Sequence, residues 1–291
     1  MKLGYFGFNM GLLATPEAME RVACAAEAAG LESLFSGEHV VVQDPQAPPS
    51  PLPPETPVID QIAALSHAAA CTKHLKLGTG IIILPQRNPV VLAKELASVD
   101  VLSRGRLLVG FGVGYVEREF EAIGVPFAER GARTSEHIEA IRALWTQAKP
   151  SFDGRFTKFS GIQSRPQPVQ KPHPPILVGG MSKSAYRRAV AHGNEWYGFY
   201  QSVDATAAAL RELEEAAKRV PRPKSLGKLG ITITPPPVPL DRDTLRRYED
   251  LGVGRLVLMR DFRDMGRPAA TSAAQVDEVV AYLEKSAREL A

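Results

Sequence analysis

The fold is decided by the stretch Lys76-Leu77-Gly78-Thr79-Gly80-Ile81-Ile82-Ile83-Leu84-Pro85-Gln86-Arg87-Asn88-Pro89. Its β-branched run predicts a strand over 76–83. Asn88 then places a capping side chain before a proline at the first helical position, and Leu92, Leu96 and Val99 recur at helical spacing. A strand that leads into a helix in this way is typical of one βα unit in a parallel sheet.

Similar units repeat along the 291 residues. Short β-branched or aromatic runs alternate with longer amphipathic segments, which predicts eight core strands. These strands are Leu3–Phe8, Ser33–Ser36, Lys76–Ile83, Leu107–Phe111, Ile176–Val178, Trp196–Phe199, Leu229–Ile233 and Arg255–Met259. Eight such units predict an α/β fold, a (β/α)8 TIM barrel, with an open doubly wound sheet as the alternative. In a barrel, chemistry belongs at the carboxyl ends of the strands.

Two insertions interrupt the repeat. Seven of the 13 residues from Pro45 to Pro57 are proline, which predicts a stiff loop after the second strand. The segment Pro150–Pro175 precedes the fifth strand and contains Phe152-Asp153-Gly154-Arg155-Phe156, an Asp-Gly turn between aromatic residues that predicts a hairpin. A glycine follows three predicted helices, and we expect the left-handed conformation at each of them: Gly30, Gly193 and Gly252.

Charge and composition exclude several classes of protein. The 35 Lys and Arg residues nearly balance the 32 Asp and Glu residues and are scattered, so nucleic acid and anionic membranes are poor partners. No apolar stretch approaches the length of a membrane span and residues 1–5 start no signal peptide, so we expect one cytoplasmic domain over 1–291. We expect Cys24 and Cys71 to be small buried hydrophobic residues of a reduced compartment.

Glu38 and His39 follow the second predicted strand directly. A barrel would therefore place a carboxylate and an imidazole at its mouth. Histidine exchanges protons near neutral pH, which suits proton transfer to or from a substrate. The alternative is a loop histidine that bonds a backbone carbonyl.

Glycines gather where other predicted strands end. Gly78 and Gly80 indicate either close approach of a flat ligand or tight packing inside the barrel. The run Gly110-Phe111-Gly112-Val113-Gly114-Tyr115 lacks the last glycine of a dinucleotide fingerprint, so it favours clearance over a ligand rather than a Rossmann site. Gly179-Gly180-Met181 precedes a helix, where exposed N–H groups and the positive helix end suit a phosphate.

Taken in order, several segments resemble the luciferase-like monooxygenase family, in particular its coenzyme F420-dependent oxidoreductase branch. These segments cover most of residues 1–200 and are Gly37–His39, Leu77–Pro89, Leu92–Asp100, Ser103–Leu107, Gly110–Gly114, Gly124–Gly131 and Pro174–Gly180. The resemblance implies a (β/α)8 barrel that holds a flavin or a 5-deazaflavin in its mouth.

The resemblance also implies roles for single residues. Glu38 and His39 are similar to the family's catalytic carboxylate and histidine near the ring, with His39 as the proton donor or acceptor. Gly80-Ile81 is similar to the place where the family often has a non-prolyl cis peptide bond. The residues implied in cofactor binding are Glu38, Thr79, Gly80, Ile81, Gly112, Gly114, Tyr115, Gly179, Gly180 and Met181, the last three at the phosphate.

One position departs from the pattern of this branch. Its sugar-phosphate dehydrogenases carry a catalytic glutamate just after the fourth-strand glycines, where this chain has Tyr115. The resemblance therefore does not extend to sugar-phosphate oxidation.

The expected function is transfer of a hydride between coenzyme F420 and a small organic substrate. We expect no metal and no nucleic-acid or membrane partner, and we expect a homodimer. The first alternative is an FMN-dependent monooxygenase fed by a separate flavin reductase, and the second is a non-catalytic flavin-binding protein. A phosphosugar lyase or isomerase would also use the turn at Gly179-Gly180, but the strand ends offer no convincing lysine or pair of carboxylates for it.

Overall fold

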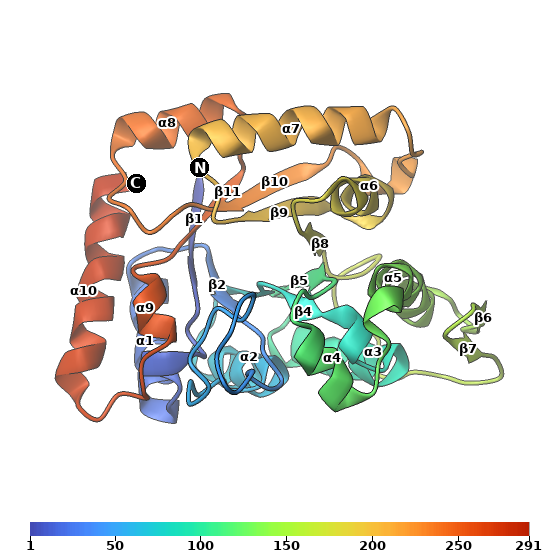
Figure 1. Cartoon of the computed structure of the whole chain (residues 1–291), viewed down its shortest axis with the longest axis horizontal. Coiled ribbons are helices and arrows are strands. Elements are labelled where there is room, and N and C mark those ends of the chain that lie inside the picture. The colour runs from blue at the N-terminus through green and yellow to red at the C-terminus, as the bar shows by residue number, and fades with distance from the viewer. Residues whose placement is uncertain (291) are drawn as a thin grey trace.

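The computed structural model describes residues 1–290 and has a closed barrel of parallel strands at its centre (Figure 1). The ring runs through β1 Lys2–Phe6, β2 Ser33–Ser36, β3 Lys76–Thr79, β5 Leu107–Gly112, β8 Ile176–Gly179, β9 Glu195–Phe199, β10 Gly230–Thr234 and β11 Arg255–Leu258. It closes because β1 pairs with both β2 and β11. The predicted barrel is confirmed, and the open sheet is wrong.

The third predicted strand is interrupted. It divides into β3 and the short β4, Ile82–Ile83, on either side of Gly80 and Ile81, whose peptide bond is cis as the resemblance implied. The pairing with β2 ends at the same place. β3 pairs with β2 through Thr79 and Ser36 and with β5 through Gly78 and Leu108, whereas β4 pairs with β5 through Ile82 and Phe111. The prediction of a single strand over 76–83 is therefore wrong.

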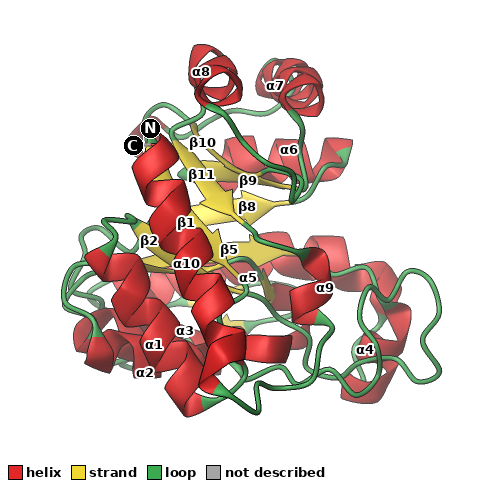
Figure 2. Ribbon diagram, turned by 90° about the vertical axis from the view of Figure 1, so that its left-hand side faces the viewer, coloured by secondary structure: helices red, strands yellow, loops and turns green. Residues whose placement is uncertain are grey.

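Longer helices surround the strands on the outside of the barrel (Figure 2). They are α1 Pro16–Ala28, α2 Gln61–Cys71, α3 Pro89–Leu102, α5 Arg130–Thr146, α6 Lys183–His192, α7 Val203–Ala217, α8 Arg242–Asp250 and α10 Ala273–Leu290. Two shorter helices, α4 Glu117–Ile123 and α9 Phe262–Met265, lie in the loops that follow β5 and β11. The predicted proline starts are confirmed, because Thr15 accepts a hydrogen bond from Ala18 N and Asn88 accepts one from Val90 N. None of the described helices is both long and apolar enough to cross a bilayer.

Both predicted insertions are present, with one difference in the turn. Residues 37–57 form a loop without helix or strand. The hairpin pairs β6, Phe152–Asp153, with β7, Lys158–Phe159. Its connection is longer than an Asp-Gly turn, because Asp153 is the last residue of β6 and Gly154 N donates to Thr157 O at 2.9 Å.

Two smaller expectations need correction. Gly30 and Gly252 have a φ of 82°, as predicted, but Gly193 has a φ of −90° and leads into an extended segment. Gly193 N is satisfied by Ala189 O, so the helix ends there without a left-handed residue. The expectation of buried cysteines is wrong: Cys24 is exposed and Cys71 is half-buried, and both are free thiols. They lie where α1 and α2 meet near the surface, with Cys24 Sγ 3.5 Å from Cys71 O.

Side chains alternate between two hydrophobic clusters along the strands. Trp196, for example, belongs to the outer cluster between strands and helices, and its neighbour Tyr197 belongs to the inner one. The inner cluster includes Phe6, Met10, Phe35, Leu108, Leu177, Tyr197, Val257, Met259 and Met265. The alternation follows from the two-residue period of a strand, and it gives the barrel a packed apolar interior.

Candidate active site

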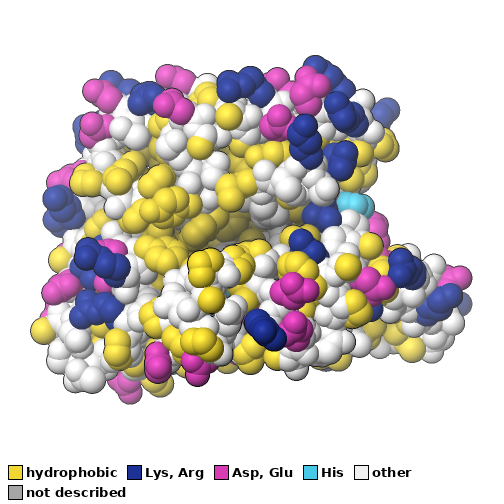
Figure 3. Space-filling model, in the orientation of Figure 1, with side chains coloured by type: hydrophobic (Ala, Val, Ile, Leu, Met, Phe, Trp, Pro, Cys, Tyr) yellow, Lys and Arg dark blue, Asp and Glu magenta, His cyan; other side chains and the backbone are white. Residues whose placement is uncertain are grey.

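A hollow opens within the ring of strands, and hydrophobic side chains surround it (Figure 3). Phe6 and Phe199 lie in this region as an edge-to-face pair, with ring centroids 5.0 Å apart. Phe199 packs against the inner cluster and is followed by Tyr200, which is about half exposed and has a φ of 59°. The aromatic row Phe6, Phe199 and Tyr200 thus leads from the barrel interior to its rim.

His39 lies at this mouth and is held by a glutamate from a distant helix. Its Nδ1 atom is 2.5 Å from Oε1 of Glu119, and the Glu119 side chain is only 1% exposed. Glu119 lies in the first turn of α4, which follows the glycines of β5. The barrel brings the two residues together because the loops after β2 and β5 leave the same end of the ring.

A second polar side chain reaches the same carboxylate. Gln86, at the end of the short 3₁₀ helix Leu84–Gln86, donates from Nε2 to Oε2 of Glu119 at 3.2 Å. Both oxygens of Glu119 therefore have partners, one in His39 and the other in Gln86. The rings of Tyr115 and His39 lie perpendicular with centroids 6.4 Å apart, so Tyr115 borders the same group.

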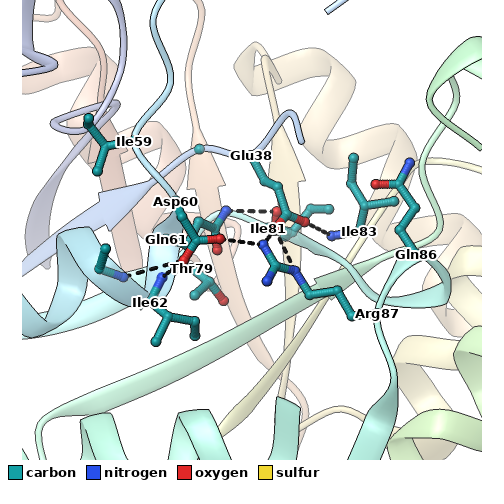
Figure 4. Close-up of polar contacts among 12 residues, drawn as sticks. Glu38, Ile59, Asp60, Gln61, Ile62, Thr79, Ile81, Ile83, Gln86 and Arg87 are labelled. Carbon is teal, nitrogen blue, oxygen red and sulfur yellow. Dashed lines mark hydrogen bonds and ion pairs between the residues drawn. The ribbon is translucent and has the colours of Figure 1, made fainter. Parts of the chain in front are cut away.

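Glu38 turns away from His39 and into a buried ion pair (Figure 4). Its Oε1 accepts hydrogen bonds from Nε and Nη2 of Arg87 at 2.9 and 2.5 Å, and its Oε2 accepts one from Ile83 N. Nη2 of Arg87 also bonds Oδ2 of Asp60 at 2.8 Å. Glu38 and His39 are adjacent in sequence, but Glu38 pairs with Arg87 and His39 pairs with Glu119.

Burial sets the electrostatics of this ion pair. Burial raises the pKa of Glu38, while the Arg87 guanidinium and the Ile83 N–H act in the opposite direction. Burial alone would lower the pKa of Arg87, but the carboxylates of Glu38 and Asp60 outweigh it and raise that pKa, so Arg87 stays charged. The charged Arg87 side chain is therefore linked through Glu38 to Ile83 of β4, next to the break between β3 and β4.

The break itself is tied down by two side chains. Nε2 of Gln61, the first residue of α2, donates to Ile81 O at 3.1 Å. Thr79 exchanges two hydrogen bonds with Gly110: its hydroxyl donates to Gly110 O at 2.8 Å and accepts from Gly110 N at 2.7 Å. These contacts replace the strand pairing that β3 gives up at this point.

The strand-end glycines make room for protein side chains. A Cβ on Gly112 would lie 2.4 Å from Cδ1 of Ile81, and one on Gly179 would lie 3.1 Å from Cγ2 of the same residue. A Cβ on Gly80 would lie 3.1 Å from Phe6 and Tyr197. Close contact with protein side chains thus accounts for all three glycines: Gly112 and Gly179 accommodate Ile81, and Gly80 accommodates Phe6 and Tyr197.

The turn at Gly179-Gly180-Met181 leads into α6 on the other side of the mouth. Gly180 has a φ of 115°, and its carbonyl accepts a hydrogen bond from Trp196 Nε1. Ser182 caps α6, whose first turn contains Lys183 and no acidic residue. The N–H groups at the start of α6 and the helix dipole suit an anion such as a phosphate.

The sequence-predicted residues therefore divide into three places. His39 and Tyr115 lie at the carboxylate of Glu119, and Glu38, Thr79, Gly80, Ile81 and Gly112 lie around the break in the third strand. Gly114 packs against Ile83 and Phe120 with a φ of 74°. Gly179, Gly180 and Met181 form the α6 turn.

Five polar residues of the site were missed by the sequence reasoning: Asp60, Gln61, Gln86, Arg87 and Glu119. Arg87 and Gln86 stand within the quoted stretch that resembles the family, and Glu119 stands one helical turn beyond Tyr115. Within residues 1–290, no group of three or more His, Cys, Asp or Glu side chains is arranged to hold a metal ion.

Residues present at the mouth fit a ring system with a phosphate tail. The hollow surrounded by hydrophobic side chains offers an apolar environment to a flat ring, and the α6 turn offers N–H groups to a phosphate. His39 and Glu119 lie at the mouth on the side of β2 and β5.

Comparison with known proteins gives relatives over nearly the whole chain. Residues 2–245 match the family described as luciferase-like monooxygenase. An uncharacterised protein of Mycobacterium tuberculosis is 31% identical over 288 residues, which cover 95% of this chain and 94% of that protein. An FMNH2-dependent dimethylsulfone monooxygenase of Pseudomonas putida is 39% identical over 137 residues, 46% of this chain and 37% of that protein.

The fold is shared with solved enzymes at lower sequence identity. An F420-dependent secondary alcohol dehydrogenase superposes with a TM-score of 0.75 at 16% identity, covering 96% of this chain and 97% of that one. The family match over residues 2–245 spans most of the strands that form the barrel. The chain belongs to the luciferase-like monooxygenase family.

Proposed function

We propose that this protein transfers a hydride between coenzyme F420 and a small organic substrate, with His39 as the proton donor or acceptor. The observation that carries the proposal is the 2.5 Å contact between His39 Nδ1 and the buried carboxylate of Glu119 at the barrel mouth. A histidine oriented in this way is suited to general acid–base catalysis.

Glu119 controls which nitrogen of His39 is available. A proton on Nδ1 donates to Oε1 of Glu119, which leaves Nε2 as the nitrogen that can exchange a proton with a substrate. The carboxylate also stabilises the imidazolium that forms when Nε2 takes up a proton. The hydrogen bond from Gln86 holds the other carboxylate oxygen in place, so the orientation of His39 is fixed by two residues.

The deazaflavin would supply the hydride chemistry when bound, and the chain would bind and orient it. The turn at Gly179-Gly180-Met181 would hold the phosphate, and the inner cluster around Phe6 and Ile81 would contact the ring. The apolar lining would exclude water from the reacting atoms. The support for F420 over FMN is the resemblance of segments such as Gly37–His39 and Leu77–Pro89 to the F420-dependent branch. The fold is compatible with either cofactor, since an F420-dependent dehydrogenase and a monooxygenase in complex with FMN both superpose on it, with TM-scores of 0.75 and 0.72.

An FMN-dependent monooxygenase is the second candidate. The observation that favours it is the 39% identity to the FMNH2-dependent dimethylsulfone monooxygenase over 46% of this chain. A separate reductase would supply reduced FMN in that case.

The deciding experiment compares the two cofactors on the purified protein. We expect F420 to bind with micromolar affinity and FMN to bind at least tenfold more weakly, as measured by equilibrium fluorescence titration. Micromolar FMN binding without F420 binding would establish the second candidate instead.

Replacing His39 tests the catalytic part of the proposal. General acid–base catalysis contributes about 10²–10⁴-fold, so His39→Ala should lower turnover by about that factor while the cofactor Kd changes little. His74→Ala is the matched control, because His74 is exposed and lies outside the mouth. The parent protein and the His39→Ala variant should both be tested on a panel of alcohols and ketones. If both bind the cofactor and neither turns over any of these substrates, the non-catalytic flavin-binding alternative is favoured.

A further inference from the structure

The two cysteines of the chain lie side by side on neighbouring helices. Cys24 is in α1 and Cys71 is the last residue of α2, and these two helices pack against each other. Sγ of Cys24 is 3.5 Å from the backbone oxygen of Cys71, and both side chains are free thiols. Both residues lie near the helix ends that lead to β2 and β3, so the pair is at the end of the barrel opposite to the mouth.

Hydrogen bonds on both sides of the pair hold α1 and α2 in register. Nε2 of His67 in α2 bonds Pro16 O at the start of α1 at 3.2 Å. Near the end of α1, the Glu27 carboxylate accepts hydrogen bonds of 2.6–3.1 Å from the N–H groups of residues 73–75, which follow α2. The two cysteines fall between these contacts along both helices, so a bond between them requires no sliding of one helix along the other.

The Cys71 thiol is close to side chains of α1. Burial first, and then the nearby Cys24 thiol and the Glu20 carboxylate, raise the pKa of Cys71 to about 11. Cys71 is therefore protonated near neutral pH and half-buried, whereas Cys24 is exposed. A reagent in solution reaches Cys24 first, because the reactivity of a thiol depends on its access and on its thiolate form.

We infer that Cys24 and Cys71 form a redox modification site, at which a low-molecular-weight disulfide such as oxidised glutathione generates an intramolecular disulfide between α1 and α2. Two thiols that the fold already holds together react with each other faster than with thiols in solution. A bridge that forms near the surface and can reopen is typical of redox-responsive proteins rather than of structural disulfides.

The reaction takes two exchange steps. The Cys24 thiolate attacks one sulfur of glutathione disulfide, which forms a mixed disulfide and releases one glutathione thiolate that takes up the proton lost by Cys24. Cys71 then loses its proton and attacks Sγ of Cys24, which breaks the mixed disulfide and releases the second glutathione as a thiol. The two cysteines lose two electrons in total, and these electrons reduce one glutathione disulfide.

Mass spectrometry of the full chain after treatment with excess oxidised glutathione tests the inference. We expect a monomer that has lost two hydrogen atoms and carries no glutathione, and peptide mapping should link Cys24 to Cys71. A glutathione adduct that persists on the parent protein, a disulfide-linked dimer on a non-reducing gel, or no reaction at all would each overturn the inference.

Serine variants separate the roles of the two thiols. Cys71→Ser removes the second step, so we expect it to accumulate one glutathione on Cys24 under conditions where the parent does not. Cys24→Ser leaves the half-buried thiol alone and should react at least tenfold more slowly than Cys71→Ser. Equal rates in the two variants would contradict the assignment of Cys24 as the first thiol to react.

Thermal unfolding shows whether the helices are already placed for the bond. A covalent ring over residues 24–71 restricts the unfolded chain, so the oxidised protein should melt about 5 °C or more above the reduced one. Excess dithiothreitol should reverse this shift, and the double variant Cys24→Ser/Cys71→Ser should show no shift with either reagent. A melting temperature of the oxidised parent that does not rise would mean that the helices must move to form the bond, which contradicts the inference.

Discussion

Nδ1 of His39 lies 2.5 Å from Oε1 of Glu119, although the two residues are separated by 80 positions in the chain. Glu119 is almost fully buried and its second oxygen is bonded by Gln86. A buried carboxylate with both oxygens engaged has a fixed orientation, so it can select one tautomer of the histidine. The reactive nitrogen of His39 is thus determined by α4 rather than by its own loop.

Glu119→Gln tests this relationship. The amide keeps the shape of the side chain but cannot stabilise a charged imidazolium, so we expect turnover to fall about 10–100-fold with an unchanged cofactor Kd. Glu121→Gln is the control, since Glu121 lies on the same helix and forms only a surface pair with Arg118. Steady-state kinetics at pH 7 should show a lower turnover for Glu119→Gln than for Glu121→Gln. Equal turnover in the two variants would show that Glu119 has no role in catalysis.

The ion pair of Glu38 and Arg87 should be strongly coupled. Arg87→Met leaves the Glu38 carboxylate, which is 3% exposed, with only the Ile83 N–H as a partner, so we expect a loss of about 3 kcal/mol of unfolding free energy. Glu38→Gln should cost less, because Arg87 is 19% exposed and keeps Asp60. In urea unfolding at pH 7 the double variant should cost less than the sum of the two, and strict additivity would contradict the coupling.

Local sequence patterns were sufficient to predict the ring of strands. Each strand run and each capped helix start is encoded within a few residues, as Asn88-Pro89 before α3 illustrates. The order of the units then determines which strand ends meet at the mouth. For that reason His39, Ile81 and Gly180 could all be assigned to one end of the barrel before their partners were known.

The residues that contact these side chains are far from them in the sequence, so no local sequence pattern could identify them. Glu119 lies on a short helix of mixed charge, where a solvent-exposed position is the ordinary expectation, and only barrel closure places it beside His39. Arg87 follows a strand but turns back to Glu38 over 49 positions. The divided third strand was also missed, because the run of isoleucines that ends at Ile83 is typical of a strand whether or not the pairing is broken.

Two glycines of β5 should respond very differently to alanine. A Cβ on Gly110 would lie 2.1 Å from the backbone oxygen of Thr79, which cannot move without breaking the strand pairing, so we expect Gly110→Ala to cost about 3 kcal/mol or more. A Cβ on Gly112 meets the flexible end of Ile81, so Gly112→Ala should cost about 1 kcal/mol.

Shortening Ile81 distinguishes the two glycines further. Ile81→Val removes the Cδ1 atom, 2.4 Å from a Cβ on Gly112, but keeps Cγ1 at 2.9 Å, so in the Gly112→Ala background it should cost less stability than it does in the parent. It should not restore Gly110→Ala, since the Thr79 oxygen remains. Thermal unfolding of the three single and two double variants checks this, and rescue of both glycine substitutions or of neither would contradict the packing argument.

Asp60 should contribute a stability that depends on pH. Burial alone would raise its pKa, but its hydrogen bond to Arg87 and the backbone N–H groups of Ile62 and Ala63 together lower it below the ordinary value of 3.8. A lowered folded pKa means that the ionised carboxylate stabilises the protein above about pH 4 and that this contribution is lost as the pH falls through the folded value.

Asp60→Asn isolates that charge, because asparagine still accepts the capping hydrogen bond from Ile62 N at the start of α2. The side chain is 48% exposed, so we expect the variant to lose no more than about 1 kcal/mol at pH 7 in urea unfolding. The difference from the parent should stay constant between pH 7 and 5, narrow below pH 4, and shrink in 1 M NaCl because salt screens an exposed pair. Asp243→Asn, at an exposed position on α8, is the control for the effect of an Asp-to-Asn substitution itself. A difference that widens as the pH falls would mean that Asp60 is protonated in the folded protein and that its partner is not the charge of Arg87.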